Sequence, residues 1–155
     1  MVYLAPITID LIMRWIKWLG LAAGILLIAS CFMVWMELPA RAIVVTGVNT
    51  GNTSFGKPGY MHLILGSIFI ILHLIPKLWA KRANLIVVAI NLAWAVRNFF
   101  VITACRAGEC PEKHTGIYLV VAASIGLLIA GLFPDMKLPQ ETVKPVSNNA
   151  ETTTL

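Results

Sequence analysis

Long apolar runs alternate with short charged segments along this chain, and this pattern predicts its architecture. A run of about 20 apolar residues is long enough to cross the roughly 30 Å hydrocarbon core of a bilayer as a helix. Charged residues and prolines bound the runs, as they often do at helix ends. We therefore predict an all-α integral membrane protein, a bundle of four transmembrane helices over about residues 15–36, 60–76, 83–103 and 115–133.

The segment between the first two runs is predicted to form a small extracytoplasmic β-hairpin-like loop. Ala42–Thr46 is rich in β-branched residues, Asn49–Asn52 favours a turn, and Thr53–Phe55 can pair back. After the last run, residues 138–155 are rich in Thr, Asn, Pro and Glu and have little apolar surface to bury. We expect a disordered cytoplasmic tail there and a membrane domain over residues 1–137.

The composition agrees with a lipid environment. Of the 155 residues, 59% are hydrophobic and only 12% are charged, about half the charged fraction of a typical soluble domain. Nucleic-acid-binding proteins also have a positive net charge such as the +5 of this chain, but here the basic residues flank the apolar runs, which is typical of membrane anchoring. We expect the lipid bilayer to surround the protein and no nucleic acid to bind it.

The distribution of lysine and arginine between the predicted loops indicates the orientation, because the side richer in these residues stays in the cytoplasm. One side collects Arg14, Lys17, Lys77, Lys81, Arg82, Lys137 and Lys144. The other side contains fewer cations and is diluted by acids: Arg41, Lys57, Arg106 and Lys113 with Glu37, Glu109 and Glu112. We therefore predict that both termini are cytoplasmic.

A cysteine pair lies in the second outer loop, in the sequence Cys-Arg-Ala-Gly-Glu-Cys over residues 105–110. Because an extracytoplasmic compartment is oxidising, we predict a structural disulfide between Cys105 and Cys110. Arg106 would favour a thiolate, so a redox-active pair is the alternative. A metal site shared with His114 is a weaker third interpretation, because no fourth ligand is evident.

Arg97 is the one strongly ionised residue inside an apolar run, where a charge is costly unless it faces protein, water or the interface. It lies about two turns from the outer end, close enough for its long side chain to reach the head-group region. Two other interpretations are a salt bridge to Glu37 and a site for an anionic ligand, either a lipid head group or a substrate carboxylate.

Asn84, Asn91 and Asn98 recur every seven residues and therefore share one face of the third predicted helix. Amides within hydrocarbon seek partners on other helices, so we expect this face to point into the bundle. A polar pathway is the alternative interpretation. No acidic residue accompanies these asparagines in any predicted span, which argues against a proton-coupled pump that needs a buried carboxylate.

Two histidines, His62 and His73, lie eleven residues apart on the second predicted helix, a spacing that would let one helix ligate two stacked haems. Each haem would need a second axial ligand, and His114 is the one further histidine. We expect all three to form hydrogen bonds rather than to bind metal, and we predict no cofactor.

Small residues predict close packing of helices. Gly20 and Gly24 form a GxxxG pattern in the first predicted helix, and Ala122, Gly126 and Ala130 recur every four residues in the last one. These patterns are compatible either with tight contacts inside the bundle or with a homodimer.

The order of four spans, a long first outer loop, a tight inner turn and a short second outer loop resembles the small four-span proteins of bacterial inner membranes. The resemblance implies a multi-pass protein of the inner (plasma) membrane and no particular activity. Claudin-type proteins share the plan but have a cysteine pair in the first outer loop, which contains no cysteine here. Quinone-linked thiol oxidases need two outer pairs, whereas this chain has three cysteines in all.

The sequence contains no constellation of residues typical of a catalytic site. We therefore predict a non-enzymatic membrane protein, either a structural or accessory subunit or a scaffold that binds partner proteins. One alternative is a membrane thiol-redox protein that uses Cys105 and Cys110. Another is a small transporter or lipid-binding protein that uses Arg97 and the asparagine face.

Overall fold

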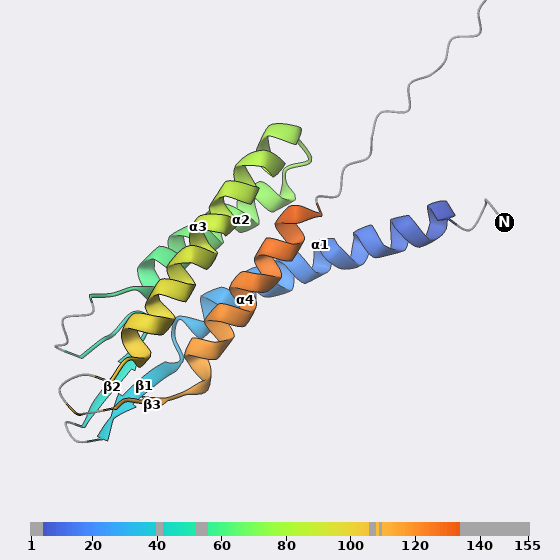
Figure 1. Ribbon diagram of the computed structural model, residues 1–155. Coiled ribbons are helices and arrows are strands. Elements are labelled where there is room, and N and C mark those ends of the chain that lie inside the picture. The colour runs from blue at the N-terminus through green and yellow to red at the C-terminus, as the bar shows by residue number, and fades with distance from the viewer. Residues whose placement is uncertain (1–4, 40–41, 52–55, 106–107, 109, 134–155) are drawn as a thin grey trace, which may run out of the picture.

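The structure, a computed structural model, describes residues 5–39, 42–51, 56–105, 108 and 110–133. In this part of the chain, four α-helices pack together and a three-stranded β-sheet closes one end of the bundle (Figure 1). The helices are α1 (Ala5–Ser30), α2 (Gly59–Leu74), α3 (Leu78–Thr103) and α4 (Thr115–Leu132). The strands are β1 (Val34–Leu38), β2 (Ile43–Thr46) and β3 (Glu112–Lys113).

The helices alternate in direction around the bundle. Each packs chiefly on two others, in the cyclic order α1, α2, α3, α4, and the contact between α1 and α4 is the most extensive. α1 and α3 end beside the sheet, whereas α2 and α4 begin there (Figure 1). The short segment Ile75–Lys77 connects α2 to α3 at the opposite end. Both predicted outer loops therefore lie at the same end of the bundle.

Within the described residues, α3 and α4 are long and apolar enough to cross a membrane by length and composition, and α2, with 16 residues, is a shorter apolar helix. The prediction of a mainly helical protein is thus confirmed, and two of its helices are candidate membrane spans. That the chain crosses the membrane four times stays a prediction.

The first predicted helix differs most from the structure. α1 begins at Ala5 and ends at Ser30 rather than at residue 36, the chain turns over Cys31–Met33, and the following residues form β1. An apolar run does not by itself distinguish a helix from a buried strand. Here Trp35 and Met36 are both buried, and β1 has a neighbouring strand on each edge, which a continued helix would not have.

The segment between α1 and α2 forms a β-hairpin, but β2 pairs with a strand that precedes it, whereas the prediction gave it a partner in Thr53–Phe55. β2 coincides with the β-branched stretch Ala42–Thr46 and pairs with β1 in antiparallel register. β3 pairs with the other edge of β1, which sets Glu112 opposite Glu37. β1 is therefore the central strand, and the sheet joins the two outer loops. Thr53–Phe55 and residues 138–155 lie outside the described residues.

The remaining helix ends differ from the prediction by a few residues. α2 ends at Leu74 because Pro76 lacks an N–H and the residue before a proline disfavours helical geometry. α3 begins at Leu78, five residues before the predicted start at 83. Lys81 therefore lies on the helix, where its Nζ donates to the carbonyl oxygen of His73 over 2.9 Å and satisfies a carbonyl group in the last turn of α2.

The N-terminal part of α1 extends beyond the other helices (Figure 1). Trp15 and Trp18 in this part are 72% and 69% exposed, and Arg14 and Lys17 are exposed beside them. Contacts with the rest of the bundle begin mainly around Gly20, where α1 approaches α4 and α2 closely. The extension therefore adds little to the core.

Several polar side chains are buried between the helices, while many large apolar side chains are exposed. Asn84, Asn91 and Asn98 are all buried on α3, whereas Ile86 and Phe100 on the same helix are 63% and 67% exposed. Large apolar side chains are also exposed along the other helices, among them Ile25, Ile71 and Leu132. Water-soluble proteins bury apolar residues and expose polar ones, so this distribution suits an apolar solvent.

The small residues that predict close packing are used mainly within the chain. A Cβ added at Gly20 would lie 2.9 Å from the Cβ of Ala130, and Gly24 and Gly126 are similarly crowded by side chains of neighbouring helices. Of this set, Ala122 is the exposed member. These residues therefore form the contacts of α1 with α2 and α4.

Candidate functional site

A chain of buried hydrogen bonds links α2, α3 and α4. His62 Nδ1 and Asn91 Oδ1 are 2.7 Å apart, and Asn91 Nδ2 donates to Ser124 Oγ over 2.9 Å. Ser124 Oγ in turn donates to the carbonyl oxygen of Val120 over 2.8 Å. The three linked side chains are at most 1% exposed. We name His62, Asn91 and Ser124 the polar core.

The hydrogen bonds assign the proton on His62. Because the Asn91 amide group donates to Ser124, its oxygen faces His62 and accepts from Nδ1–H. Nε2 then holds the lone pair. This atom is buried and has no hydrogen-bond partner among the described residues. The polar core thus contains one unused acceptor in a mainly apolar interior.

Trp35 covers the polar core at the sheet end. Its side chain is fully buried, and its Nε1 donates to the carbonyl oxygen of Ser30 over 2.8 Å. Its ring meets the His62 ring edge-on, with 6.2 Å between centroids. Two glycines make room for the indole: a Cβ at Gly47 would lie 2.6 Å from its Cζ2, and one at Gly116 2.9 Å from its Cδ1. Trp35 therefore anchors the sheet to the bundle.

The other two asparagines flank Asn91 on the same buried face. Asn84 and Asn98 are 2% and 4% exposed. In the described part of the chain, Asn84 Oδ1 and Asn98 Nδ2 have no hydrogen-bond partner. The asparagine face therefore points into the bundle, and its central member forms hydrogen bonds with both neighbouring helices.

Among the described residues, the structure does not bring Arg97 and Glu37 together. Arg97 is exposed, and its guanidinium carbon lies 5.1 Å from the centroid of the Trp94 ring. Glu37 faces His114 instead, with 3.5 Å between Oε2 and Nε2, a separation suited to an ion pair but without hydrogen-bond geometry. Both side chains of that pair are 39% exposed, so solvent screens their attraction.

The histidines have separate surroundings. His73 lies near the end of α2 that is remote from the sheet; its ring stacks on Phe69 at 5.1 Å between centroids, and its Nε2 is 3.2 Å from the carbonyl oxygen of Lys17. His62 belongs to the polar core, and His114 faces Glu37. The described residues include no group of three or more His, Cys, Asp or Glu side chains suited to a metal ion.

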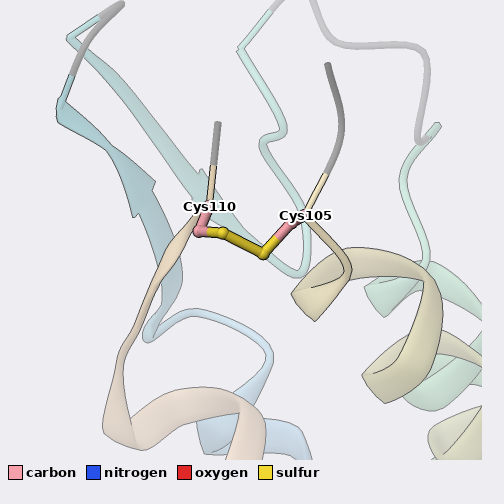
Figure 2. The surroundings of a disulfide bond; sticks show 2 residues. All are labelled: Cys105 and Cys110. Carbon is pink, nitrogen blue, oxygen red and sulfur yellow. A yellow bond between two sulfur atoms is a disulfide. The ribbon is translucent and has the colours of Figure 1, made fainter. Parts of the chain in front are cut away.

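Cys105 and Cys110 form a disulfide just beyond the end of α3 that lies beside the sheet, which confirms the predicted pairing (Figure 2). Both cysteines are exposed, and their Cα atoms are 4.2 Å apart. Gly108 between them has a φ of 82°, a backbone region that favours glycine. The bond links the end of α3 to the segment that enters β3. Cys31, in contrast, is buried, and its Sγ donates to the carbonyl oxygen of Leu27 over 3.2 Å.

We expect the Cys105–Cys110 bond to stay oxidised in living cells when the supply of terminal oxidant or quinone is varied. A structural disulfide in an oxidising compartment has no partner that reduces it in each cycle. Trapping of free thiols in intact cells, followed by a gel shift, measures the oxidised fraction, with the Cys31→Ser variant as control. A fraction that follows the oxidant supply would instead favour the thiol-redox alternative.

Sequence reasoning did not single out Ser124, and it did not predict that Trp35 is buried. Ser124 has a lone hydroxyl group in a long apolar run, and such a group in hydrocarbon seeks a partner on another helix. Its pairing with the asparagine face could therefore have been predicted. No comparable local pattern identifies Trp35, because it lies in a run that also reads as helix.

Comparison of the chain with protein-family models, with curated proteins and with solved structures found no match.

Proposed function

We propose that the chain is an integral membrane protein that crosses the bilayer four times and acts as a structural or accessory subunit, or as a scaffold that presents its sheet to a partner protein. The main support is the distribution of polar and apolar side chains. Hydrogen-bonding side chains of α2, α3 and α4 are buried between these helices, while large apolar side chains are exposed along all four helices. Such an arrangement is favourable in hydrocarbon and unfavourable in water.

The packing of the helices supports the proposal that α1 and α2 cross the membrane together with α3 and α4. α1 and α2 pack on α4 and α3, the helices that are long and apolar enough to span. α2 has 16 residues and is therefore about 24 Å long, shorter than the roughly 30 Å hydrocarbon core. The buried Trp35 covers the first turn of α2 on the side of His62, so protein covers that side of this end of the helix.

The two ends of the bundle support the orientation. Lys77, Lys81 and Arg82 lie at the end opposite the sheet, which is expected on the cytoplasmic side. The disulfide lies at the sheet end, where an oxidising compartment would keep it formed. Both observations favour the sheet outside and both termini in the cytoplasm, and the membrane that we propose is the inner (plasma) membrane of a bacterium.

The state of the polar core favours a structural role over catalysis. His62, Asn91 and Ser124 are nearly inaccessible, and their hydrogen bonds hold three helices together. Bonds of this kind specify how helices pair within a membrane. The sheet forms a surface at one end of the bundle, on which Val44 is 47% exposed.

Labelling of engineered cysteines in intact cells tests the proposal. In a Cys31→Ser background, Val44→Cys should react with a membrane-impermeant maleimide from outside, and Arg82→Cys only after permeabilisation. If α3 and α4 alone crossed the membrane, both positions would lie on the same side. Labelling of both positions only after permeabilisation would therefore contradict four spans.

The same Val44→Cys protein tests the scaffold role when its cysteine carries a photoactivatable crosslinker. We expect a discrete protein adduct from this position, and none from Ile86→Cys, which faces outward from α3. An adduct of twice the chain mass would identify a second copy as the partner. The absence of any adduct, together with elution as a monomer in mild detergent, would contradict the scaffold.

A further inference from the structure

We infer that the outer parts of α2 and α3 bind the phosphate group of an anionic phospholipid. Two exposed cations lie there, each over an aromatic ring. Lys57 Nζ is 5.7 Å from the centroid of Tyr60, and the Arg97 guanidinium carbon is 5.1 Å from the centroid of Trp94. We name Lys57, Tyr60, Trp94 and Arg97 the cation–aromatic patch.

A hydrogen bond joins the two halves of this patch. Trp94 Nε1 on α3 donates to the carbonyl oxygen of Pro58 over 3.1 Å, and Pro58 directly follows Lys57 at the start of α2. The indole is thereby held against the entry of α2, while its ring face supports Arg97. The patch is therefore a composite of both helices rather than two separate surface cations.

The charges of the patch lack an internal counterion. Within the described residues, neither Lys57 nor Arg97 forms an ion pair with an acidic side chain, and Glu37 faces His114 instead. A cation near the hydrocarbon boundary is stabilised when an anionic head group replaces lost water. Lysine and arginine side chains both form charge-assisted hydrogen bonds to phosphate oxygens.

The surface next to the patch indicates a lipid rather than a soluble anion. Met61 and Ile68 lie seven residues apart on one side of α2, and Ile90 precedes Arg97 by seven residues on one side of α3. These three apolar side chains are 40%, 38% and 50% exposed. A molecule with an anionic head and apolar chains would cover both regions, whereas an acidic peptide or a nucleic acid would leave the apolar part uncovered.

Native mass spectrometry of the full chain in mild detergent, with added dioleoylphosphatidylglycerol, tests this site. We expect the wild type to retain one lipid, and the double variant Lys57→Ala/Arg97→Ala to bind it at least about tenfold more weakly because two charge-assisted contacts are lost. The control Arg82→Ala/Lys113→Ala removes the same charge from exposed positions elsewhere and should bind like the wild type. Arg97→Lys, which keeps the charge, should retain most of the affinity.

Several outcomes would overturn the inference. The first is an equal affinity for the lipid in the double variant and the wild type, and the second is an equal loss of affinity in the charge-matched control. The third is displacement of the lipid by excess inorganic phosphate, which would identify a free anion as the ligand. If the double variant does not fold, Lys57→Ala alone, which lies before α2, should still weaken binding several-fold. The inference depends on the proposed membrane placement, which the labelling of Val44→Cys and Arg82→Cys reports independently. If the labelling shows the expected topology but no specific lipid binding is found, the lipid site is wrong and the proposed membrane placement stands.

Discussion

Replacing Trp35 by alanine is expected to lower the free energy of unfolding by about 3 to 5 kcal/mol, as truncation of a fully buried aromatic side chain does. The indole is 0% exposed, fills the space that Gly47 and Gly116 leave, and donates to the carbonyl oxygen of Ser30. Its removal would leave a cavity between the sheet and the bundle, and the carbonyl oxygen of Ser30 would keep only the hydrogen bond that it accepts from the Met33 N–H. Titration with sodium dodecyl sulfate in mixed micelles, followed by circular dichroism, measures the change.

Two further variants separate the causes. Trp35→Phe keeps most of the ring but not the Nε1–H, so we expect a smaller loss, of which the missing hydrogen bond accounts for about 1 kcal/mol. Trp15→Ala removes a tryptophan that is 72% exposed and should change stability by no more than about 0.5 kcal/mol. Equal losses for Trp35→Ala and Trp15→Ala would contradict the anchoring role of Trp35.

Replacing Asn91 by alanine is expected to cost about 2 to 4 kcal/mol, because it removes two hydrogen bonds between helices and leaves the Nδ1–H of His62 buried without a partner. The same micelle titration measures this loss. Asn84→Ala is a matched control: it removes the same side chain from the same buried face, but one whose Oδ1 has no partner in the described part of the chain. We expect the control to cost less than half as much.

A double-mutant cycle isolates the bond itself. His62→Ala, Asn91→Ala and the combined variant should show a coupling energy of about 1 kcal/mol, since each single change already breaks the contact. A coupling near zero, or equal losses for Asn91→Ala and Asn84→Ala, would mean that these side chains act only by filling space.

Periodic features of the sequence predicted the interior well. The seven-residue spacing of Asn84, Asn91 and Asn98 placed them on one helix face, and all three are buried. Likewise, Cys105 and Cys110 are close enough in sequence for a short loop to pair them, and they are bonded. Both inferences depend on residues only a few positions apart, whose separation the local backbone largely sets.

Contacts between distant segments were not predicted. Glu37 has His114 as its neighbour because β1 and β3 pair across the sheet, while Arg97 lies over Trp94 on its own helix. Nothing near Arg97 in the sequence shows which way its side chain turns. A role for Lys57 beside α3 was not predicted either, because its proximity to α3 depends on the hydrogen bond between Trp94 and Pro58, which are distant in the sequence.

The apolar runs alone were enough to determine that the chain is mainly helical, that its polar face is internal and that its charges gather at helix ends, because hydrophobic periodicity and charge act within a few turns of helix. The tertiary structure decided where the first run stops being a helix. Val34–Leu38 becomes a strand because β2 and β3 offer it hydrogen-bond partners and the end of the bundle offers Trp35 a buried place. These partner strands lie up to about eighty residues away in the sequence, and no local pattern predicts that they pair with β1.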